Sequence, residues 1–168
     1  NVSVTEGPGN GKLEKVETPG LGTIEAVVEF FGFPKNGTRK SLALIDSEGK
    51  PVVAIVPGDH ELNECKAEHV FGKGYRMMTD EELEKFGLFK GFIGPVHLPA
   101  GIKLVCDSSL KESKSWACGA NEIDYHFTGA CPDRDFKVDE WADLVTVLAG
   151  DPCPHCGKPL AAARGIEV

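Results

Sequence analysis

The clearest helical pattern in the chain lies between residues 23 and 32. Its apolar side chains recur at i, i+3, i+4 and i+7, the spacing of one helix face: Ile24, Val27, Val28 and Phe31. Thr23 stands where an N-cap is expected, and Gly32, followed by Pro34, ends the pattern. These signals predict an amphipathic helix over 24–31.

Two short apolar runs follow at 41–45 and 51–56, with a polar segment that contains glycine between them. Runs of this length, rich in Leu, Ile and Val and joined by a short loop, are typical of a β-hairpin. The pattern therefore predicts two paired strands, with Lys40 at the start of the first one.

A second helix is predicted after Thr79. Residues 79–82 read Thr-Asp-Glu-Glu, which is the spacing of a capping box, and the acidic residues suit the positive end of the helix dipole. Gly87 is a suitable C-terminal stop. We therefore expect a short helix between Thr79 and Gly87.

The second half of the chain consists of short apolar or aromatic runs separated by Gly, Pro, Asn and Asp. Four of them predict strands joined by functional loops: 92–93, 102–106, 116–118 and 125–128. Residues 141–148 have helical spacing, but 144–148 is also an apolar run, so helix and strand both stay open. The whole pattern predicts one α+β domain, in which a few helices pack on a mixed, mostly antiparallel sheet.

The composition fits one soluble domain. With 168 residues, of which 41% are hydrophobic, the chain can build a single core. It has neither an apolar run of about 18 residues nor an export signal, so we expect a soluble, cytoplasmic protein without a membrane contact. Residues 1–18 are rich in glycine and proline, as linkers are. From the missing initiator Met and the lack of a polar tail, we expect both ends to be cut.

The net charge of −8 argues against broad electrostatic binding of nucleic acid. Such binding uses a basic face that displaces counterions from many phosphates. Basic residues gather only locally: Lys35, Arg39 and Lys40, and again Lys111 and Lys114. Charge alone favours a solvated surface, and if the substrate is RNA, most of the affinity must come from elsewhere.

The six cysteines are expected to be reduced, because the chain carries no export signal. The strongest metal-like signal is the CxxC formed by Cys153 and Cys156, but a structural zinc needs four ligands. Cys118, Cys131 and His126 could complete a set only at an unusual spacing. A tight turn is the favoured interpretation, so we expect no metal, with Cys153 and Cys156 as weak candidates.

Standard catalytic motifs are absent from the sequence, which has no GxSxG, no HExxH, no phosphate-binding loop and no recognisable cysteine–histidine pair. Polar residues do stand at predicted strand ends: Lys40, Asp59, Asp107, Asn121 and His126. The glycine-rich loop 91–95 could bring backbone N–H groups close to a ligand and stabilise an oxyanion. Taken singly, each of these residues is more often structural.

Short stretches along nearly the whole chain occur in the order and spacing of one known family. They include Thr-Arg-Lys-Ser-Leu at 38–42 and Gly-Phe-Ile-Gly-Pro-Val at 91–96. The others are 16–19, 23–25, 58–64, 118–122, 125–127, 134–136, 142–144, 150–152 and 164–168. Together they resemble the insertion domain of bacterial prolyl-tRNA synthetases, a relative of freestanding aminoacyl-tRNA deacylases. The resemblance implies a junction at 1–18, an editing domain at 19–160 and a return segment toward the synthetase core at 161–168.

The resemblance also implies an editing site. It gives catalytic roles to Lys40, Gly91, Pro95 and His126. It gives substrate-binding roles to Thr38, Gly94, Asp107, Gly119 and Asn121. Lys40 would hold the terminal adenosine phosphate or the reacting ester, backbone donors of the 91–95 loop would receive the carbonyl oxygen, and His126 would orient the 3′ end. The CxxC segment recurs in some members without belonging to the editing site.

The implied activity is removal of alanine from wrongly charged tRNA for proline, so that the chain is an aminoacyl-tRNA deacylase acting in cis. The ester is already reactive, and a positioned water, a stabilised carbonyl oxygen and the neighbouring ribose hydroxyl suffice. Editing is needed because one missing methylene changes binding in the synthetic site by only about 1–3 kcal/mol. The editing pocket would exclude proline by size.

The implied partners are tRNA for proline, through its 3′ aminoacyl end, and the rest of a synthetase that is expected to be a homodimer. Editing needs no cofactor, because ATP and Mg serve only the synthetase core, which the chain lacks. Two alternatives stay open: a freestanding trans-editing deacylase, and a noncatalytic tRNA- or zinc-binding module. Residues 164–168, which in synthetases lead back into the catalytic core, favour the insertion.

Overall fold

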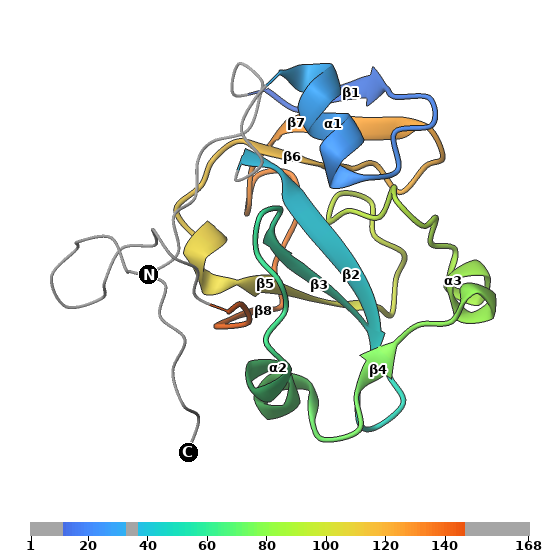
Figure 1. The fold of residues 1–168 in the computed structure, drawn as a ribbon, viewed down its shortest axis with the longest axis vertical. Coiled ribbons are helices and arrows are strands. Elements are labelled where there is room, and N and C mark those ends of the chain that lie inside the picture. The colour runs from blue at the N-terminus through green and yellow to red at the C-terminus, as the bar shows by residue number, and fades with distance from the viewer. Residues whose placement is uncertain (1–11, 33–36, 147–168) are drawn as a thin grey trace, which may run out of the picture.

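The computed structural model describes residues 12–32 and 37–146 (Figure 1). Its strands are β1 (Glu14–Glu17), β2 (Arg39–Ile45), β3 (Pro51–Pro57), β4 (Arg76–Met77), β5 (Lys103–Asp107), β6 (Trp116–Gly119), β7 (Tyr125–Ala130) and β8 (Glu140–Ala142). Its helices are α1 (Ile24–Phe31), α2 (Glu64–Phe71), α3 (Asp80–Phe86) and a short 3₁₀ helix, Ser108–Leu110. Cys153 and Cys156, the weak metal candidates, lie outside the described residues.

The strands form two sheets that share a core (Figure 1). One is a three-stranded antiparallel sheet in the order β1-β7-β6, and the other has five strands in the order β4-β2-β3-β5-β8. In the larger sheet β2 is antiparallel to β4 and β3, whereas β5 is parallel to β3 and β8. The result is the α+β fold that the sequence predicts, with mostly antiparallel pairing.

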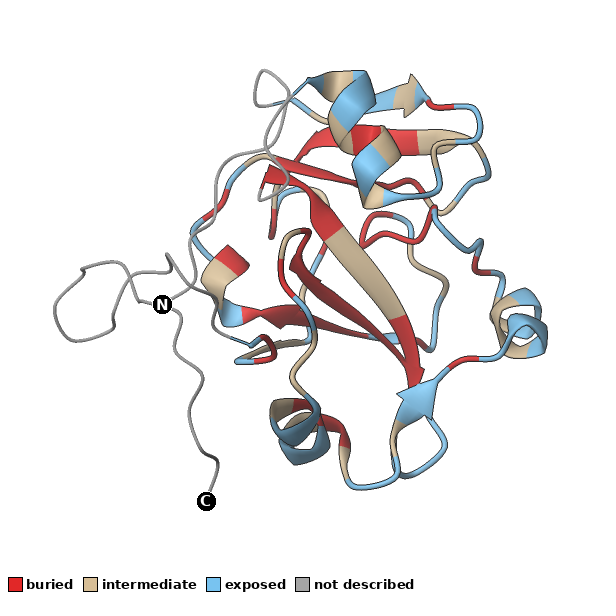
Figure 2. Cartoon of the chain, viewed as in Figure 1, coloured by how far each residue is buried: buried red, intermediate tan, exposed pale blue. Residues whose placement is uncertain are grey.

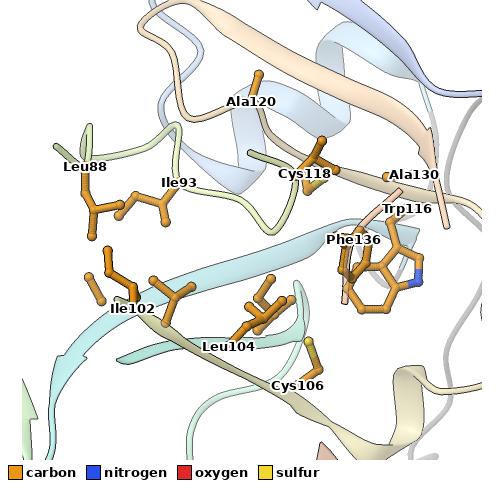
Figure 3. Packing of buried hydrophobic residues seen from close by; sticks show 14 of the residues in the cluster. Leu88, Ile93, Ile102, Leu104, Cys106, Trp116, Cys118, Ala120, Ala130 and Phe136 are labelled. Atoms are coloured by element: carbon orange, nitrogen blue, oxygen red, sulfur yellow. The ribbon is translucent and has the colours of Figure 1, made fainter. Parts of the chain in front are cut away.

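The main hydrophobic core lies between these sheets. Figure 3 shows Leu104 and Cys106 of β5 on one side and Trp116 and Cys118 of β6 on the other. Ile93, from the loop that follows α3, packs into the same cluster. Burial of each large apolar side chain stabilises the fold by about 1.5–3 kcal/mol, so this cluster fixes how the loop and the two sheets sit together.

A second apolar cluster covers the opposite face of the five-stranded sheet. Val52 and Val56 of β3 pack there with Ala67 and Phe71 of α2 and with Leu144. The central strand β3 is therefore buried on both faces, which Figure 2 shows as a continuous buried strand. A strand covered on both faces needs an unbroken apolar sequence, and 51–56 has one.

Two helices begin and end at the predicted residues. The Thr23 side chain caps α1, and Gly32 ends it in the left-handed conformation with φ 69°. Thr79 and Glu82 form both hydrogen bonds of the capping box of α3, which ends at Gly87. The predicted hairpin is also confirmed as β2 and β3.

Three elements have only weak local signals and were not predicted. β1 lies within 1–18, the segment with linker composition, and forms because Glu14–Glu17 pairs with β7. α2 buries only Ala67 and Phe71, so its apolar stripe is narrow, although Asn63 caps it and Gly72 ends it. β4 is a two-residue strand held by β2.

Two segments differ from the sequence prediction or complete it. The strand predicted at 92–93 is wrong, because these residues form a buried loop that packs against the end of β6. In the ambiguous segment 141–148, the described part is extended. Residues 141 and 142 belong to β8, and Val145 forms an isolated bridge with Leu62.

Candidate functional site

A cavity of about 570 Å³ opens along the outer edge of β2. This edge is paired with β4 only at Leu44 and Ile45, and at its other end Thr38 bridges to Ala117 of β6. Residues 39–43, between these contacts, line the cavity. An edge strand carries backbone donors and acceptors, so a ligand in this gap meets main-chain polar groups as well as side chains.

The other walls come from segments that are far apart in the sequence. They are the start of α1, the region of β4 and α3, the loop after α3, the turn after β3, and the three-stranded sheet. The residues involved are Gly22, Thr23, Ile24, Glu25, Val27, Met77, Met78, Asp80, Leu83, Lys90, Gly91, Ile93, Gly58, Glu61, Gly119 and His126.

Lys40, the second residue of β2, carries an ammonium group at this cavity. Its Nζ donates to Oε1 of Glu61 at 3.0 Å. The Lys40 side chain is 21% exposed, whereas that of Glu61 is 85% exposed. Because one partner stands in solvent, the pair contributes at most about 1 kcal/mol, and the ammonium can turn to a ligand at little cost.

Within the described residues, the side-chain hydrogen bonds to the loop 91–96 all come from Asn121. Its Oδ1 accepts the Gly94 N–H at 3.0 Å, and its Nδ2 donates to the carbonyls of Gly94 at 2.7 Å and Val96 at 2.8 Å. The Asn121 backbone N–H also donates to the Phe92 carbonyl at 2.8 Å. These bonds satisfy the buried backbone of the loop and fix its shape.

Glycine allows this loop to approach its neighbours more closely than other residues could. A Cβ on Gly94 would lie 1.8 Å from the carbonyl oxygen of Gly119. A Cβ on Gly91, which has φ 86°, would lie 2.7 Å from the Cα of Gly22. The wall formed by the loop therefore depends on residues without a side chain.

The backbone N–H groups of two loop residues, Gly91 and Ile93, are candidate donors to a ligand. Both residues line the cavity, and neither N–H donates to an acceptor within the described part of the chain. The Gly94 N–H is taken by Asn121, and Pro95 has no N–H. Fixed donors of this kind stabilise negative charge that develops on a carbonyl oxygen.

His126 reaches the cavity from β7. Its Nδ1 lies 2.6 Å from Oγ1 of Thr18, both side chains are buried, and the ring packs on Phe92 with centroids 5.3 Å apart. Burial lowers the pKa of His126 to about 4, because it disfavours the charged imidazolium. At pH 7 the imidazole is therefore a neutral hydrogen-bonding group, and within 12–32 and 37–146 its Nε2 has no hydrogen-bonding partner.

The two fully buried thiols of the core serve packing. Burial raises the pKa of Cys118 to about 12 and raises that of Cys106 well above its usual range, so neither thiol forms a nucleophilic thiolate at pH 7. Neither residue lines the cavity. Among the residues that the structure describes, no three His, Cys, Asp or Glu side chains gather as a metal site.

The cavity lies within the part of the chain that matches a known family. A sequence profile of the aminoacyl-tRNA editing domain matches residues 18–136, which include every residue that lines the cavity. The chain belongs to the aminoacyl-tRNA editing domain family.

Relatives of this editing domain are found within longer proteins. It is 48% identical over 158 residues to a proline–tRNA ligase of Thermotoga neapolitana and 46% identical over 165 residues to one of Trichlorobacter lovleyi. These matches cover 93% and 96% of this chain but 27% and 29% of the two ligases. The chain thus spans less than a third of the length of these relatives.

The fold of the editing domain is also found in solved structures. A protein described as a trans-editing enzyme for prolyl-tRNA synthetase superposes with a TM-score of 0.67 at 21% identity. The superposition covers 80% of this chain and 87% of that one, and shows a common fold.

No helix within 12–32 or 37–146 is long and apolar enough to cross a membrane.

The structure brings four of the predicted site residues to the wall of the editing domain's cavity: Lys40, Gly91, Gly119 and His126. Thr38 stands at one end of the open β2 edge, and Gly94 and Asn121 shape the loop behind the wall. Pro95 borders a different hollow, next to His97.

Asp107, the remaining predicted residue, lies away from the cavity of the editing domain. Its buried carboxylate accepts the N–H of Ser109 at 3.1 Å and the N–H of Leu144 at 2.8 Å. It therefore caps the 3₁₀ helix and holds the segment after β8. These contacts give Asp107 a structural role, and Asp107 does not line the cavity.

Sequence reasoning passed over several residues that line the cavity of the editing domain. Ser41 has a buried hydroxyl with no partner among the described residues. Lys90, Glu25, Glu61 and Asp80 also line the cavity. Arg39 lines it too, but its guanidinium donates to Oγ of Ser113 and lies over the Trp116 ring. Carboxylates as well as ammonium groups line the cavity, so it is not simply an anion site. Glu61 falls in the matched stretch 58–64, which is the one signal that could have singled it out.

The buried His126 makes the stability of the domain sensitive to acid. Its folded-state pKa is lowered to about 4, below the usual 6.5, so the neutral state favours folding above pH 6.5 and this stability is lost as the pH falls toward 4. We expect the loss from this residue to reach about 3 kcal/mol between pH 7 and pH 4. Denaturant unfolding of the wild type and of His126→Gln at several pH values measures the difference. Equal pH dependence of the two proteins would contradict the assignment.

Proposed function

We propose that this domain hydrolyses alanyl-tRNA(Pro), the tRNA for proline wrongly charged with alanine, as the editing part of a proline–tRNA ligase. The observation that carries the proposal is that Lys40, Gly91, Ile93 and the neutral His126 line one cavity, and that the N–H groups of Gly91 and Ile93 have no acceptor among the described residues. The similarity to proline–tRNA ligases over nearly the whole chain supports the cis arrangement. The implied partners are tRNA for proline and the rest of the ligase.

The proposed reaction needs no nucleophile from the protein. The N–H groups of Gly91 and Ile93 bind the ester carbonyl oxygen, and the ammonium of Lys40 stabilises the charge that develops there. The oxygen of a water molecule attacks the carbonyl carbon, and the bond from that carbon to the ribose oxygen breaks. The ribose oxygen takes a proton, and free alanine and tRNA leave. The neighbouring ribose hydroxyl assists the proton transfer, and His126 orients the 3′ end through Nε2.

The cavity as a whole is too large to distinguish alanine from proline. Its volume of about 570 Å³ lies within the range of roughly 300–1,000 Å³ that is usual for small-molecule sites, so it has room for the terminal nucleoside as well as the amino acid. We therefore propose that the size sieve is the part of the cavity that would take the aminoacyl side chain, beside the carbonyl-binding groups.

The isolated domain is expected to release alanine from alanyl-tRNA(Pro) and to leave prolyl-tRNA(Pro) intact. Because the net charge is −8, only a few phosphates are contacted, and the affinity should be weak and fall further as salt rises. We propose that the reaction uses no metal or other cofactor, so a strong chelator in the assay should not change the rate. A deacylation assay with both tRNAs over a salt series measures all of this.

Each outcome of this assay is informative. Equal hydrolysis of the two tRNAs would refute the size sieve. Tight binding that does not respond to salt would show that affinity resides in contacts other than phosphates. Loss of activity with chelator that only zinc restores would overturn the proposal that no metal is used. No hydrolysis of either tRNA would favour the noncatalytic binding module.

A further inference from the structure

We propose that Glu61 binds the α-ammonium group of the aminoacyl ester, and thereby makes the cavity selective for aminoacyl over other acyl groups. The inference rests on the proposed function, because it concerns the same ester in the same cavity. It assigns a substrate contact to a residue that otherwise serves only as the partner of Lys40.

The backbone of Glu61 is fixed while its carboxylate stays accessible. The Glu61 carbonyl accepts the N–H of Thr146 at 3.1 Å, and the next residue, Leu62, forms a bridge with Val145. The side chain is 85% exposed and lines the cavity. A carboxylate anchored at its backbone and open at its tip can receive a ligand without rearrangement of the fold.

The carboxylate has unused capacity to accept hydrogen bonds. A carboxylate offers about four lone-pair positions on its two oxygens. Lys40 occupies Oε1 at 3.0 Å, and within 12–32 and 37–146 it is the only hydrogen-bonding partner of the Glu61 side chain. The second oxygen, Oε2, is therefore available to another cation.

The Lys40–Glu61 pair is complementary to the reacting end of the substrate. In an aminoacyl ester the α-carbon carries both an ammonium group and the ester carbonyl, so a cation and a polarised oxygen are neighbours. An α-amino group has a pKa of about 8 in peptides, so a large part of it is charged at pH 7. The ammonium of Lys40 suits the carbonyl oxygen, and the carboxylate of Glu61, 3.0 Å away, suits the substrate ammonium.

Of the three carboxylates that face the cavity, Glu61 is the one paired with Lys40. Glu25 lies in the first turn of α1 and Asp80 in the first turn of α3, on other walls. The position beside the proposed carbonyl-binding cation is what singles out Glu61, because the substrate ammonium must lie close to the ester carbonyl.

The test compares two nearly isosteric esters, alanyl-tRNA(Pro) and lactyl-tRNA(Pro), in which a hydroxyl replaces the α-ammonium. We expect Glu61→Gln to lower kcat/KM for alanyl-tRNA(Pro) about tenfold and to change that for lactyl-tRNA(Pro) little, because only the first ester loses a charge-assisted contact. Glu61→Asp keeps the charge and should retain part of the preference. Spontaneous hydrolysis of each ester is measured without protein and subtracted.

The matched control is Glu112→Gln, which removes the same charge from an exposed residue outside the cavity. It should leave both rates unchanged. An equal fall of both rates with Glu61→Gln would show that Glu61 only positions Lys40. No fall of either rate would show that Glu61 has no role in the reaction. Either result overturns the inference. If the wild type hydrolyses lactyl-tRNA(Pro) but not alanyl-tRNA(Pro), both this inference and the proposed function fail. If the inference alone fails, the wild type still hydrolyses alanyl-tRNA(Pro).

Discussion

Lys40→Ala is expected to slow hydrolysis of alanyl-tRNA(Pro) about 100-fold or more, because removal of one fixed group that stabilises developing charge typically costs 10²–10³ in rate. The fold should be retained. The Lys40 ammonium pairs with an exposed carboxylate, and an ion pair of this kind contributes at most about 1 kcal/mol to stability. Single-turnover deacylation beside a thermal melt measures both effects.

Lys50→Ala is a matched control for this variant. Lys50 lies in the loop at the opposite end of the same hairpin, is 70% exposed and also pairs with a glutamate, Glu48, but it does not line the cavity. The control removes the same charge and should leave the rate unchanged. An active Lys40→Ala would remove this lysine from the mechanism, and an unfolded Lys40→Ala would assign it to the fold.

Gly94→Ala is expected to lower the free energy of unfolding by about 2–4 kcal/mol and to abolish most of the activity. The added Cβ would lie 1.8 Å from the carbonyl oxygen of Gly119, a backbone atom that cannot move without shifting β6. The loop must therefore leave its place, and the N–H groups of Gly91 and Ile93 move with it. Denaturant unfolding and the deacylation rate are the two measurements.

Two companion variants separate the causes of this effect. Gly22→Ala adds the same methyl group nearby, where its closest neighbour outside residues 21–23, the Gly91 Cα, is 3.8 Å away, so the unfolding free energy should change little. Asn121→Gly suits the positive φ of 55° at that position but removes three side-chain hydrogen bonds to the loop. It should lower activity with a smaller loss of stability. Unchanged stability of Gly94→Ala would show that the loop is not held as described.

The sequence by itself determined the elements whose signals are local. The caps at Thr23 and Thr79 fixed the starts of α1 and α3, since a capping bond reaches only two or three residues along the chain. The apolar runs on either side of 46–50 fixed the hairpin, because its strands are neighbours in sequence. The resemblance then identified Lys40, Gly91, Gly119 and His126, which share the cavity.

Tertiary structure alone decided where these residues meet, which backbone conformation they adopt and which charge they carry. β1 exists because β7 pairs with it, across more than 100 residues of sequence. The sequence pattern of Phe92 and Ile93 is that of a strand, but they form a loop. Asn121 binds that loop, and Gly94 and Gly119 allow its backbone to lie against β6. No sequence pattern encodes how close two backbones come.

The chemical properties of the site depend on the same long-range contacts. His126 is neutral because other segments bury it, and Glu61 acquires its proposed role because the turn after β3 places its carboxylate 3.0 Å from the ammonium of Lys40. The open edge of β2 lies between contacts with β4 and β6, which are distant in sequence. Burial and distance arise only when separate segments pack together, so residue types could indicate the candidates while the folded chain set their geometry and charge.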